Sequence, residues 1–248
     1  MRLLFLLAVA LAGCATTHGT RTAGPLTIHT FRRDWTNVHA VVGTEGAFLV
    51  DAGLAANAQA LEDDLRASGI DPARLRAIIV THGHADHAGG ALHFRERFGT
   101  PIVAGRGDEA MLGAGRNEQL CPVGEDARAR FEADQAATFP SFVPDRQIDA
   151  ETDLRELTGV PGRIVPLPGH TEGSLVVVVN EAALVGDLFR GTVFTEGAEV
   201  HFYMCDLDDN RRDVDALLHS IAPEASTFFV GHFGPLRRDV VVDRFSAR

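Results

Sequence analysis

The stretch that decides how this chain is interpreted is residues 77–90, AIIVTHGHADHAGG. Four apolar or β-branched residues are followed within a few positions by His82, His84, Asp86 and His87. Three imidazoles beside one carboxylate are unfavourable on their own, because protonated imidazoles repel one another. A divalent cation removes this conflict, since neutral imidazole nitrogens and carboxylate oxygens both donate lone pairs to it. The stretch therefore predicts a metal site.

The spacing within this stretch separates its members into two groups. His82 and His84 are two residues apart, so an extended backbone would point both side chains the same way. Gly83 lies between them, and we expect its lack of a side chain to let the loop approach the metal closely. Asp86 and His87 are then expected to turn toward a second metal position.

Four other His or Asp residues each follow a short apolar run elsewhere in the chain. They are Asp51 in FLVDAG, His170 in PLPGHTEGS, Asp187 in AALVGDLF and His232 in FFVGHFGP. We expect the ends of these runs to gather at one edge of the sheets, which would bring all four residues to the predicted metal site.

The apolar runs also predict the fold class. Short runs rich in β-branched residues are typical of strands, and they occur here as VHAVVG, GAFLVD, AIIVTH, TPIVAG, SLVVVVN, AALVGD and TFFVGH. Helical patterns occur between them at 55–69, which ends in Gly69, and at 208–222, where apolar residues recur with helical spacing. Strands that alternate with helices indicate a layered α/β domain.

The pattern HxHxDH after an apolar strand resembles the metallo-β-lactamase-fold superfamily of metallohydrolases. The resemblance extends from about residue 37 to 235, because the later residues occur in the family's order. It implies a four-layer αββα sandwich. It also implies a role for each candidate: the first metal is held by His82, His84 and His170, and the second by Asp86, His87 and His232. Asp187 would bridge both metals, and Asp51 would orient the ligands from behind.

The same resemblance implies a dinuclear hydrolase. Two divalent metal ions, zinc first and iron or manganese as alternatives, would activate a bridging hydroxide at neutral pH. Asp86 and Asp187 are the predicted catalytic carboxylates. The substrate would be a small molecule that contains an ester, lactone, thioester or amide.

Several subclasses of the superfamily remain open. Lactam-cleaving members generally lack the bridging aspartate, whereas Asp187 is present here. Thioesterases of the glyoxalase II type share the ligand set, but their basic C-terminal region for glutathione has no counterpart in this chain, which contains no Lys. Related lactonases often carry a Tyr just after the bridging Asp, where this chain has Leu188 and Phe189. A mononuclear iron oxygenase that acts on persulfides is the other alternative, although the second ligand set is complete.

Residues 105–162 interrupt the alternation of strands and helices. We expect a partly helical insertion there, which either forms a lid or substrate wall or is a solvated decoration. We expect the remaining histidines to have no role in the metal site; they are His18, His29, His39, His93, His201 and His219. The stretch HFYMC at 201–205 is expected to pack in the core, with substrate contact through Tyr203 as the alternative. Phe189 and Arg190 are weaker candidates for the pocket wall. Cys121 and Cys205 either form a disulfide or are two separate buried thiols.

The N-terminus, MRLLFLLAVALAGC, has a positive charge at Arg2, a short apolar run and small residues before Cys14. This pattern is typical of a secretory signal and resembles a bacterial lipoprotein signal. Residues 1–13 are therefore predicted to be a signal peptide, with Cys14 lipidated and residues 14–25 forming a polar tether. The folded domain is predicted at 26–248. The protein would then lie outside the cytoplasm, anchored by its lipid to a bacterial membrane, with the periplasmic side of the outer membrane favoured.

The charge of the chain restricts its partners. The formal net charge is −11 at pH 7, and every basic residue other than histidine is Arg. An acidic chain without a basic stripe is poorly suited to bind nucleic acid phosphates. The sequence thus favours a small-molecule substrate and leaves the oligomeric state open.

Overall fold

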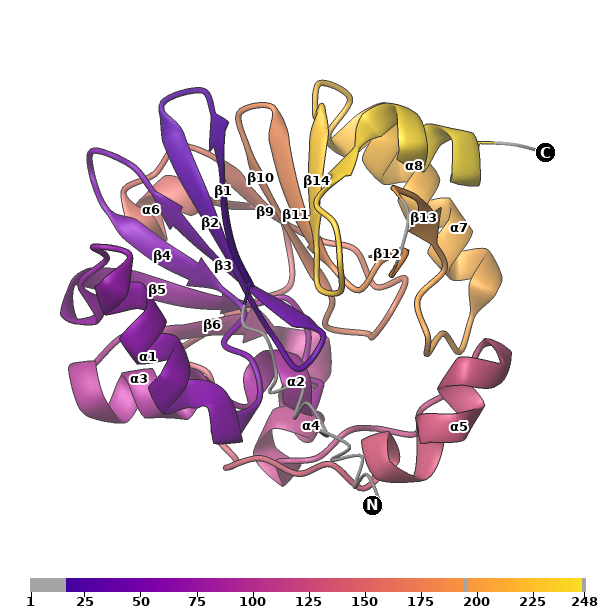
Figure 1. Ribbon diagram of the computed structural model, residues 1–248, viewed down its shortest axis with the longest axis horizontal. Helices are drawn as coiled ribbons and strands as arrows, with labels where there is room; N and C mark the ends of the chain where they lie inside the picture. The colour runs from indigo at the N-terminus through magenta and orange to yellow at the C-terminus, as the bar shows by residue number, and fades with distance from the viewer. Residues whose placement is uncertain (1–16, 194–195, 247–248) are drawn as a thin grey trace, which may run out of the picture.

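The computed structural model describes residues 17–193 and 196–246. Two β-sheets face each other, and helices cover the outer face of each, so that the layers run helix, sheet, sheet, helix (Figure 1). The predicted four-layer αββα sandwich is confirmed.

The first sheet has the strand order β1-β2-β3-β4-β5-β6-β7, and the second has the order β15-β14-β11-β10-β9-β8. The strands of the first sheet are β1 (Thr17–Ala23), β2 (Leu26–Arg33), β3 (Thr36–Val42), β4 (Ala47–Val50), β5 (Leu75–Val80), β6 (Ile102–Gly105) and β7 (Arg146–Ile148). Those of the second are β8 (Thr152–Asp153), β9 (Arg163–Pro166), β10 (Leu175–Val179), β11 (Ala182–Gly186), β14 (Thr227–Val230) and β15 (Leu236–Arg237). A small separate pair consists of β12 (Arg190–Gly191) and β13 (Ala198–Glu199).

The helices connect these strands and form the outer layers. They are α1 (Ala58–Ala67), α2 (Ala85–Ala88), α3 (Ala91–Phe98), α4 (Glu109–Ala114), α5 (Gly124–Gln135), α6 (Leu154–Thr158), α7 (Leu207–Ala216) and α8 (Arg238–Phe245). Shorter helical turns are η1 (Ala55–Asn57), η2 (Pro72–Arg74), η3 (Arg106–Asp108) and η4 (Leu217–Ile221). The two helical patterns of the sequence are thus found as η1 with α1 and as α7 with η4.

Three apolar clusters hold the layers together. The first lies between α1 and α3 and the first sheet, and includes Leu65 and Phe94. The second fills the space between the two sheets, where Phe48 and Phe229 are buried. The third packs α7 and α8 on the second sheet and includes Leu217. Because apolar residues of the inner strands face a layer on both sides, these strands have continuous apolar sequences rather than alternating ones.

All seven apolar runs of the sequence form strands, namely β3, β4, β5, β6, β10, β11 and β14. β4 pairs with β5 in parallel, and β11 pairs with β14 in parallel. The carboxyl ends of parallel strands meet at the same edge of a sheet. The residues that follow these strands are therefore brought together at one edge of the sandwich.

The predicted tether is wrong for most of its length. Thr17–Ala23 forms β1, which pairs with residues 26–32 of β2 through a hairpin whose turn contains Gly24 at φ 55°. The residues before Ala23 in this strand are exposed, so their small polar character reflects an edge strand, and β-branched threonines favour that conformation. The predicted signal peptide, residues 1–13, and the predicted lipidation site, Cys14, lie outside the described residues.

The predicted insertion at 105–162 contains more than helices. It starts with η3, α4 and α5, and then adds β7 to the edge of the first sheet and β8 to the edge of the second. α5 lies away from both sheets at the end of the sandwich where α2 and α4 also lie (Figure 1). This segment thus completes both sheets and also supplies a separate helix.

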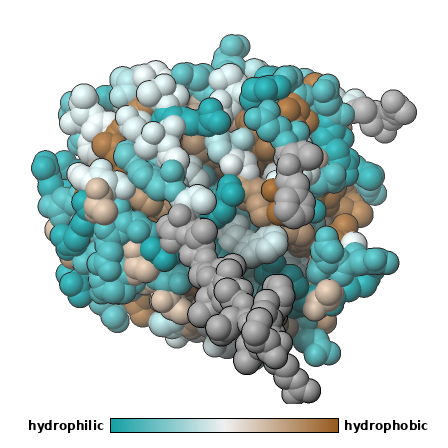
Figure 2. Space-filling model, in the orientation of Figure 1, coloured by the Kyte–Doolittle hydropathy of each residue, from teal (hydrophilic) through white to brown (hydrophobic). Residues whose placement is uncertain are grey.

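The molecular surface is mostly polar on the face seen in Figure 2, with hydrophobic residues in small, separate patches. The large apolar side chains that are exposed include Trp35 and Val143. Among the described residues, no helix combines the length and the apolar character needed to cross a bilayer.

Candidate metal centre

The predicted metal-binding stretch forms the turn between β5 and α2. β5 ends at Val80, and His82 and His84 lie in the loop that follows. His84 is the residue that precedes α2, and α2 carries Asp86 and His87 in its single turn. The short helix therefore carries Asp86 and His87 toward a second position, as the spacing predicts, although the ring centroid of His87 stays 4.1 Å from that of His82.

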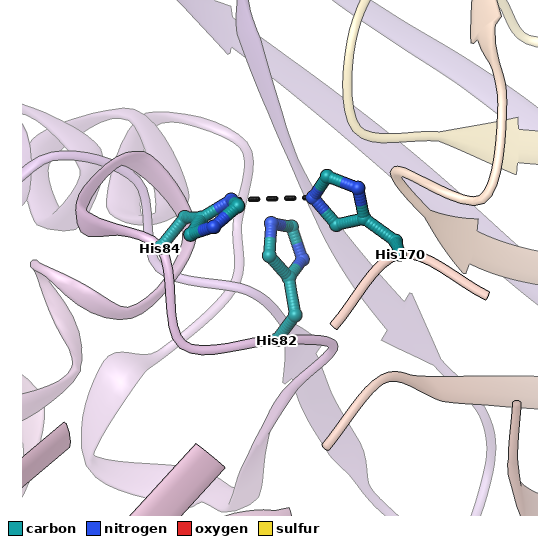
Figure 3. Close-up of side chains that lie close together, drawn as sticks. All are labelled: His82, His84 and His170. Carbon is teal, nitrogen blue, oxygen red and sulfur yellow. Dashed lines mark hydrogen bonds between the residues drawn. The ribbon is translucent and has the colours of Figure 1, made fainter. Parts of the chain in front are cut away.

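The first predicted ligand set is assembled. His82, His84 and His170 offer nitrogen atoms that all lie within 4.8 Å of one another, and all three residues are buried. Figure 3 shows the three rings converging, with Nδ1 of His84 3.2 Å from Nε2 of His170. Ligand atoms that share one tetrahedral zinc lie about 3.4 Å apart. This separation therefore suits a metal ion held between the rings.

The second predicted set is also assembled. Asp86, His87 and His232 form another group whose ligand atoms lie within 4.8 Å of one another. Oδ2 of Asp86 is 3.4 Å from Nε2 of His232 and 3.7 Å from Nε2 of His87. α2 and the loop after β14 thus supply one compact group of two nitrogens and one oxygen.

Asp187 joins the two sets. Its Oδ2 lies 3.6 Å from Nε2 of His82 and 3.8 Å from Nε2 of His170, which belong to the first set. The same oxygen lies 3.3 Å from Nε2 of both His87 and His232, which belong to the second set. A carboxylate in this position is placed to bridge two metal ions.

Asp51 supports one ligand of each set from behind. Its Oδ2 accepts a hydrogen bond from Nδ1 of His87 at 2.8 Å. The hydroxyl of Thr81 donates to the same carboxylate at 2.9 Å and lies 3.1 Å from Nδ1 of His82. Asp51 itself has a positive φ of 65°, an unusual backbone conformation for a residue other than glycine. The carboxylate therefore fixes the ring orientations of His82 and His87.

The tip of the β2–β3 hairpin supports the second set. Nδ1 of His232 hydrogen-bonds to the carbonyl of Trp35 at 3.0 Å, and the hydroxyl of Thr36 donates to Oδ2 of Asp86 at 3.0 Å. Asp34 and Trp35 both have positive φ values, 47° and 76°. This backbone is the one that a tight two-residue hairpin requires, and it points the Trp35 carbonyl at the metal centre.

Burial and charge set the protonation of the rings. Burial lowers the pKa of His84 to about 4, and it lowers the pKa of His82 and His170 well below the ordinary value. For His232, burial also lowers the pKa, but the carboxylates of Asp187 and Asp86 outweigh it and raise the pKa to about 9. The first set is therefore neutral and able to donate lone pairs, whereas protons on the second set balance the buried carboxylate of Asp187 and the half-buried one of Asp86.

The residues present fit two divalent cations. Nε2 of His82 and His87 and Oδ1 of Asp187 are buried without a hydrogen-bond partner, which is costly unless another ligand satisfies them. Cations would also replace the protons that neutralise Asp86 and Asp187. A set rich in imidazole nitrogen with carboxylate oxygens is the donor chemistry that zinc, iron and manganese accept.

The comparison with known families agrees with this geometry. The model of the metallo-beta-lactamase superfamily matches residues 33–232, which is most of the chain. The chain belongs to this superfamily. The match ends at His232, the last member of the second ligand set.

Relatives in the superfamily include a hydroxyacylglutathione hydrolase, GloC, of Haemophilus influenzae, which is 30% identical over 48% of this chain and 52% of its own length. An acyl-coenzyme A thioesterase, MBLAC2, of Gallus gallus is 29% identical over 66% of this chain and 59% of its own length. The matched region thus spans between half and three fifths of these relatives. Among solved structures, a subclass B3 metallo-beta-lactamase of Bradyrhizobium japonicum superposes with a TM-score of 0.58 at 19% identity, covering 83% of this chain and 74% of that chain.

A pocket of about 100 Å³ opens onto the metal centre. One of its walls comes from α5 and the residues around it, including Ala127, Arg130 and Asp134. Of the two interpretations of the 105–162 segment, a wall of the candidate site is therefore the one that the structure supports. The adjoining part of the wall contains Phe202 and Tyr203.

A disulfide fastens these two walls together. Cys121, which precedes α5, is bonded to Cys205. Two backbone hydrogen bonds lie beside it, from Val123 to Phe202 and from Met204 to Cys121. The sequence left the pairing of these cysteines open, because their separation in the chain says nothing about their distance in space.

His201 is the member of the centre that sequence reasoning missed. Its Nε2 lies 2.9 Å from Oδ2 of Asp187, and it lines the pocket. With His170 and Asp187 it forms a further group that could hold a metal ion. The residue follows β13 in an irregular loop, so neither a strand end nor a repeating pattern marks it in the sequence.

Other expectations for this region need correction. Tyr203 is buried as expected, but it also lines the pocket, and its hydroxyl donates to Asp134 at 2.6 Å instead of facing the metal ligands. Phe189 is fully buried and packs against Phe228, so it belongs to the core. Arg190 lies over the ring of Phe202 at 4.0 Å and does not line the pocket.

The reason for Gly83 also differs from the expectation. A side chain there would meet Asp108 and Met111, at 3.1 Å from each, and not the metal position. The backbone N–H of Gly83 donates to Asp108, which also accepts from the hydroxyl of Thr171. Asp108 thereby ties the loop that carries His82 and His84 to the loop that carries His170.

Proposed function

We propose that this chain is a dinuclear metal-dependent hydrolase of small acyl compounds, with zinc as the metal and thioesters as the first substrate class to test. The observation that carries the proposal is the position of Asp187, whose Oδ2 lies within 3.8 Å of two nitrogens from each ligand set. Two bound divalent ions would supply Lewis acidity and an activated water.

The residues of the chain perform the remaining tasks. Asp51 and the carbonyl of Trp35 hold the rings of His87 and His232, so that their Nε2 atoms face the centre. Burial keeps His82, His84 and His170 unprotonated at neutral pH. The pocket walls from α5 and from residues 202–203 would enclose the acyl group and keep bulk water away from it.

The preference for thioesters rests on the named activities of the relatives. A hydroxyacylglutathione hydrolase and an acyl-coenzyme A thioesterase both cleave thioester bonds.

The charges that line the pocket restrict which thioester fits. Arg130, the cation in its described wall, forms an ion pair with Asp134 at 3.4 Å, and Asp34 also lines the wall. We therefore propose a small substrate of low negative charge, so that glutathione and coenzyme A carriers would bind weakly.

The test is a substrate panel on the purified, metal-loaded chain. It contains a short acyl thioester of an uncharged thiol, S-lactoylglutathione, an acyl-coenzyme A, a γ-lactone and a chromogenic cephalosporin. We expect the highest kcat/KM with the uncharged thioester. Turnover of the cephalosporin alone would favour a β-lactamase instead. Oxygen uptake with a persulfide and one bound iron would favour the oxygenase, although the complete second ligand set supports two metals.

We further propose that the protein is exported and anchored by a lipid on Cys14. The support is the signal-like N-terminal sequence that ends in LAGC. A paired Cys121–Cys205 disulfide is compatible with an oxidising compartment. Metabolic labelling with palmitate should mark the wild-type chain in the membrane fraction. A Cys14→Ala chain that is still labelled and still sediments with membranes would contradict the proposal.

A further inference from the structure

His201 occupies the centre of the candidate site without belonging to either ligand set. Its ring is 3% exposed, and Nε2 lies 2.9 Å from Oδ2 of Asp187. The ring centroid lies 4.9 Å from that of His170, in the first set, and 5.1 Å from that of His232, in the second. His201 therefore stands beside the point where the two sets meet, and it faces the pocket from which a substrate would enter.

The backbone of the following residues holds the ring in place. The N–H of Tyr203 donates to Nδ1 of His201 at 3.3 Å. With Nδ1 as an acceptor, the proton of the neutral ring is on Nε2, which is buried without a hydrogen-bond partner although it lies 2.9 Å from Oδ2 of Asp187. The opposite tautomer would donate from Nδ1 to the Tyr203 carbonyl at 3.4 Å and would place the Nε2 lone pair against a carboxylate oxygen. Two lone pairs at 2.9 Å repel, so the hydrogen-bond distances favour the first tautomer.

The hydroxyl of Tyr203, the other polar side chain of this segment near the centre, is engaged elsewhere. Its hydroxyl donates to Oδ2 of Asp134 at 2.6 Å, on the wall formed by α5. The disulfide between Cys121 and Cys205 and the hydrogen bond from Val123 to Phe202 fasten the 201–205 segment to the same wall. The segment thus has a fixed path, which directs the imidazole of His201 inward and the phenol of Tyr203 sideways.

We propose that His201 is a further catalytic residue, which donates a hydrogen bond from Nε2 to the substrate oxygen that gains negative charge during acyl transfer. The inference rests on the proposed hydrolase function and deepens it. His201 transfers no proton in this role; the acyl carbon gains a bond to the attacking water oxygen, the bond to the thiolate, alkoxide or lactone oxygen breaks, and the proton lost by the water ends on that leaving group. A fixed donor in a buried site stabilises such an oxyanion strongly, and the loss of one such donor lowers kcat by about 10²–10³ fold.

The alternative role for His201 is that of an additional metal ligand, since His170, Asp187 and His201 form a group that could hold an ion. The two roles make different predictions for metal content. If His201 is a metal ligand, its replacement lowers the metal affinity. If it is only a hydrogen-bond donor to the substrate, its replacement leaves the metal content unchanged.

The experiment compares His201→Phe and His201→Gln with the wild type, and uses His219→Gln as the matched control, because His219 is exposed on η4. Metal per chain is measured by elemental analysis, and the cobalt-substituted forms are compared by visible absorption. Rates are measured with the best substrate of the panel, and thermal melting checks that each variant folds. We expect His201→Phe to retain both metals and an unchanged cobalt spectrum, with kcat about 100-fold lower and KM changed by less than about threefold. His201→Gln, which keeps an N–H donor at a similar reach, should recover at least tenfold of that loss.

Two results would overturn the inference alone: a folded His201→Phe or His201→Gln chain that loses metal, or a His201→Phe chain whose kcat stays within threefold of an active wild type. If His201→Phe fails to fold, His201→Gln decides, because a loss of metal from it contradicts the donor role and retained metal with partial activity supports it. A wild-type chain that binds two metals but cleaves no member of the panel overturns the proposed function, and this inference with it.

Discussion

The carboxylate of Asp51 accepts a hydrogen bond from Nδ1 of His87 at 2.8 Å, and through the hydroxyl of Thr81 it also reaches His82. One buried carboxylate thereby orients a ligand in each of the two sets. Removal of such a support typically costs 10- to 100-fold in metal affinity. Asp51 is 1% exposed, so water cannot replace it.

We therefore expect Asp51→Asn to bind its metals about 10- to 100-fold more weakly than the wild type, measured by competition with a chromophoric zinc chelator. Thr81→Val is the matched variant, because it removes only the hydroxyl that links Asp51 to Nδ1 of His82 and leaves the hydrogen bond between Asp51 and His87. It should weaken binding less than Asp51→Asn. Equal affinities for Asp51→Asn and the wild type would show that the rings need no support from Asp51.

Gly231 determines how closely two ligands pack. A Cβ atom at this position would lie 2.1 Å from Oδ1 of Asp187 and 2.5 Å from Cε1 of His87. Gly231→Ala should displace both ligands and lower the metal content below two per chain. Gly113→Ala is the control, because a Cβ there has no neighbour within 4 Å among the described atoms and its helix favours Ala. A Gly231→Ala chain with full metal content would contradict the arrangement of these ligands.

The Cys121–Cys205 disulfide closes a loop with a sequence separation of 84 residues. Cross-links of this kind restrict the unfolded chain and typically contribute about 2–4 kcal/mol to the free energy of unfolding. The double variant Cys121→Ser/Cys205→Ser should lose about that much in urea denaturation, compared with the untreated wild type. Wild-type protein that melts at the same temperature with and without reductant would argue against a bonded pair.

The pH dependence of stability should contain a contribution from His39. The ring is 3% exposed, lies 3.0 Å from the Thr30 hydroxyl and 3.2 Å from the Val230 carbonyl, and burial lowers its pKa to about 4. In the unfolded chain the pKa is about 6.5. Between these values the unfolded chain binds a proton that the folded chain does not. Stability is therefore lost as the pH falls from about 6.5 to 4, and the loss at pH 5 is about 2 kcal/mol.

His39→Gln tests this effect, because glutamine cannot take a proton in this range. The wild type should lose about 2 kcal/mol more of its unfolding free energy than the variant when the pH falls from 7.5 to 5. The difference between the two chains removes effects that both share, such as metal release at low pH. Parallel pH profiles for the two chains would mean that His39 titrates normally in the folded state.

Local patterns predicted a layered α/β domain with His and Asp residues at the ends of its strands, whereas the four-layer arrangement and the set of seven ligands were implied by the family resemblance. Apolar β-branched runs marked the inner strands, and a His or Asp at the end of a parallel strand is carried to a common edge. Asp187 and His232 follow β11 and β14 in this way. β1 was missed because its residues are polar and exposed, so only pairing with β2 reveals it.

Other features depend on contacts between distant residues, which no local pattern encodes. His201 faces Asp187 because the irregular loop before α7 is fastened to the segment before α5 by a disulfide. The carbonyl of Trp35 reaches His232 because two residues of a hairpin turn have positive φ values. A glycine is needed at position 83 because Asp108 and Met111 fill the space beside it. From the sequence alone, we expected the small residue to let the loop approach the metal.

The most direct test of the central claim is the amount of metal per chain, measured by elemental analysis of protein purified without chelator, together with His84→Ala and Asp187→Ala. The wild type should contain close to two zinc ions per chain. Both variants should remain folded and inactive, His84→Ala should keep one ion, and Asp187→Ala should keep fewer than two, because its Oδ2 faces both ligand sets. A wild type that holds a single iron, or an Asp187→Ala chain that keeps two metals and its activity, would contradict the dinuclear hydrolase.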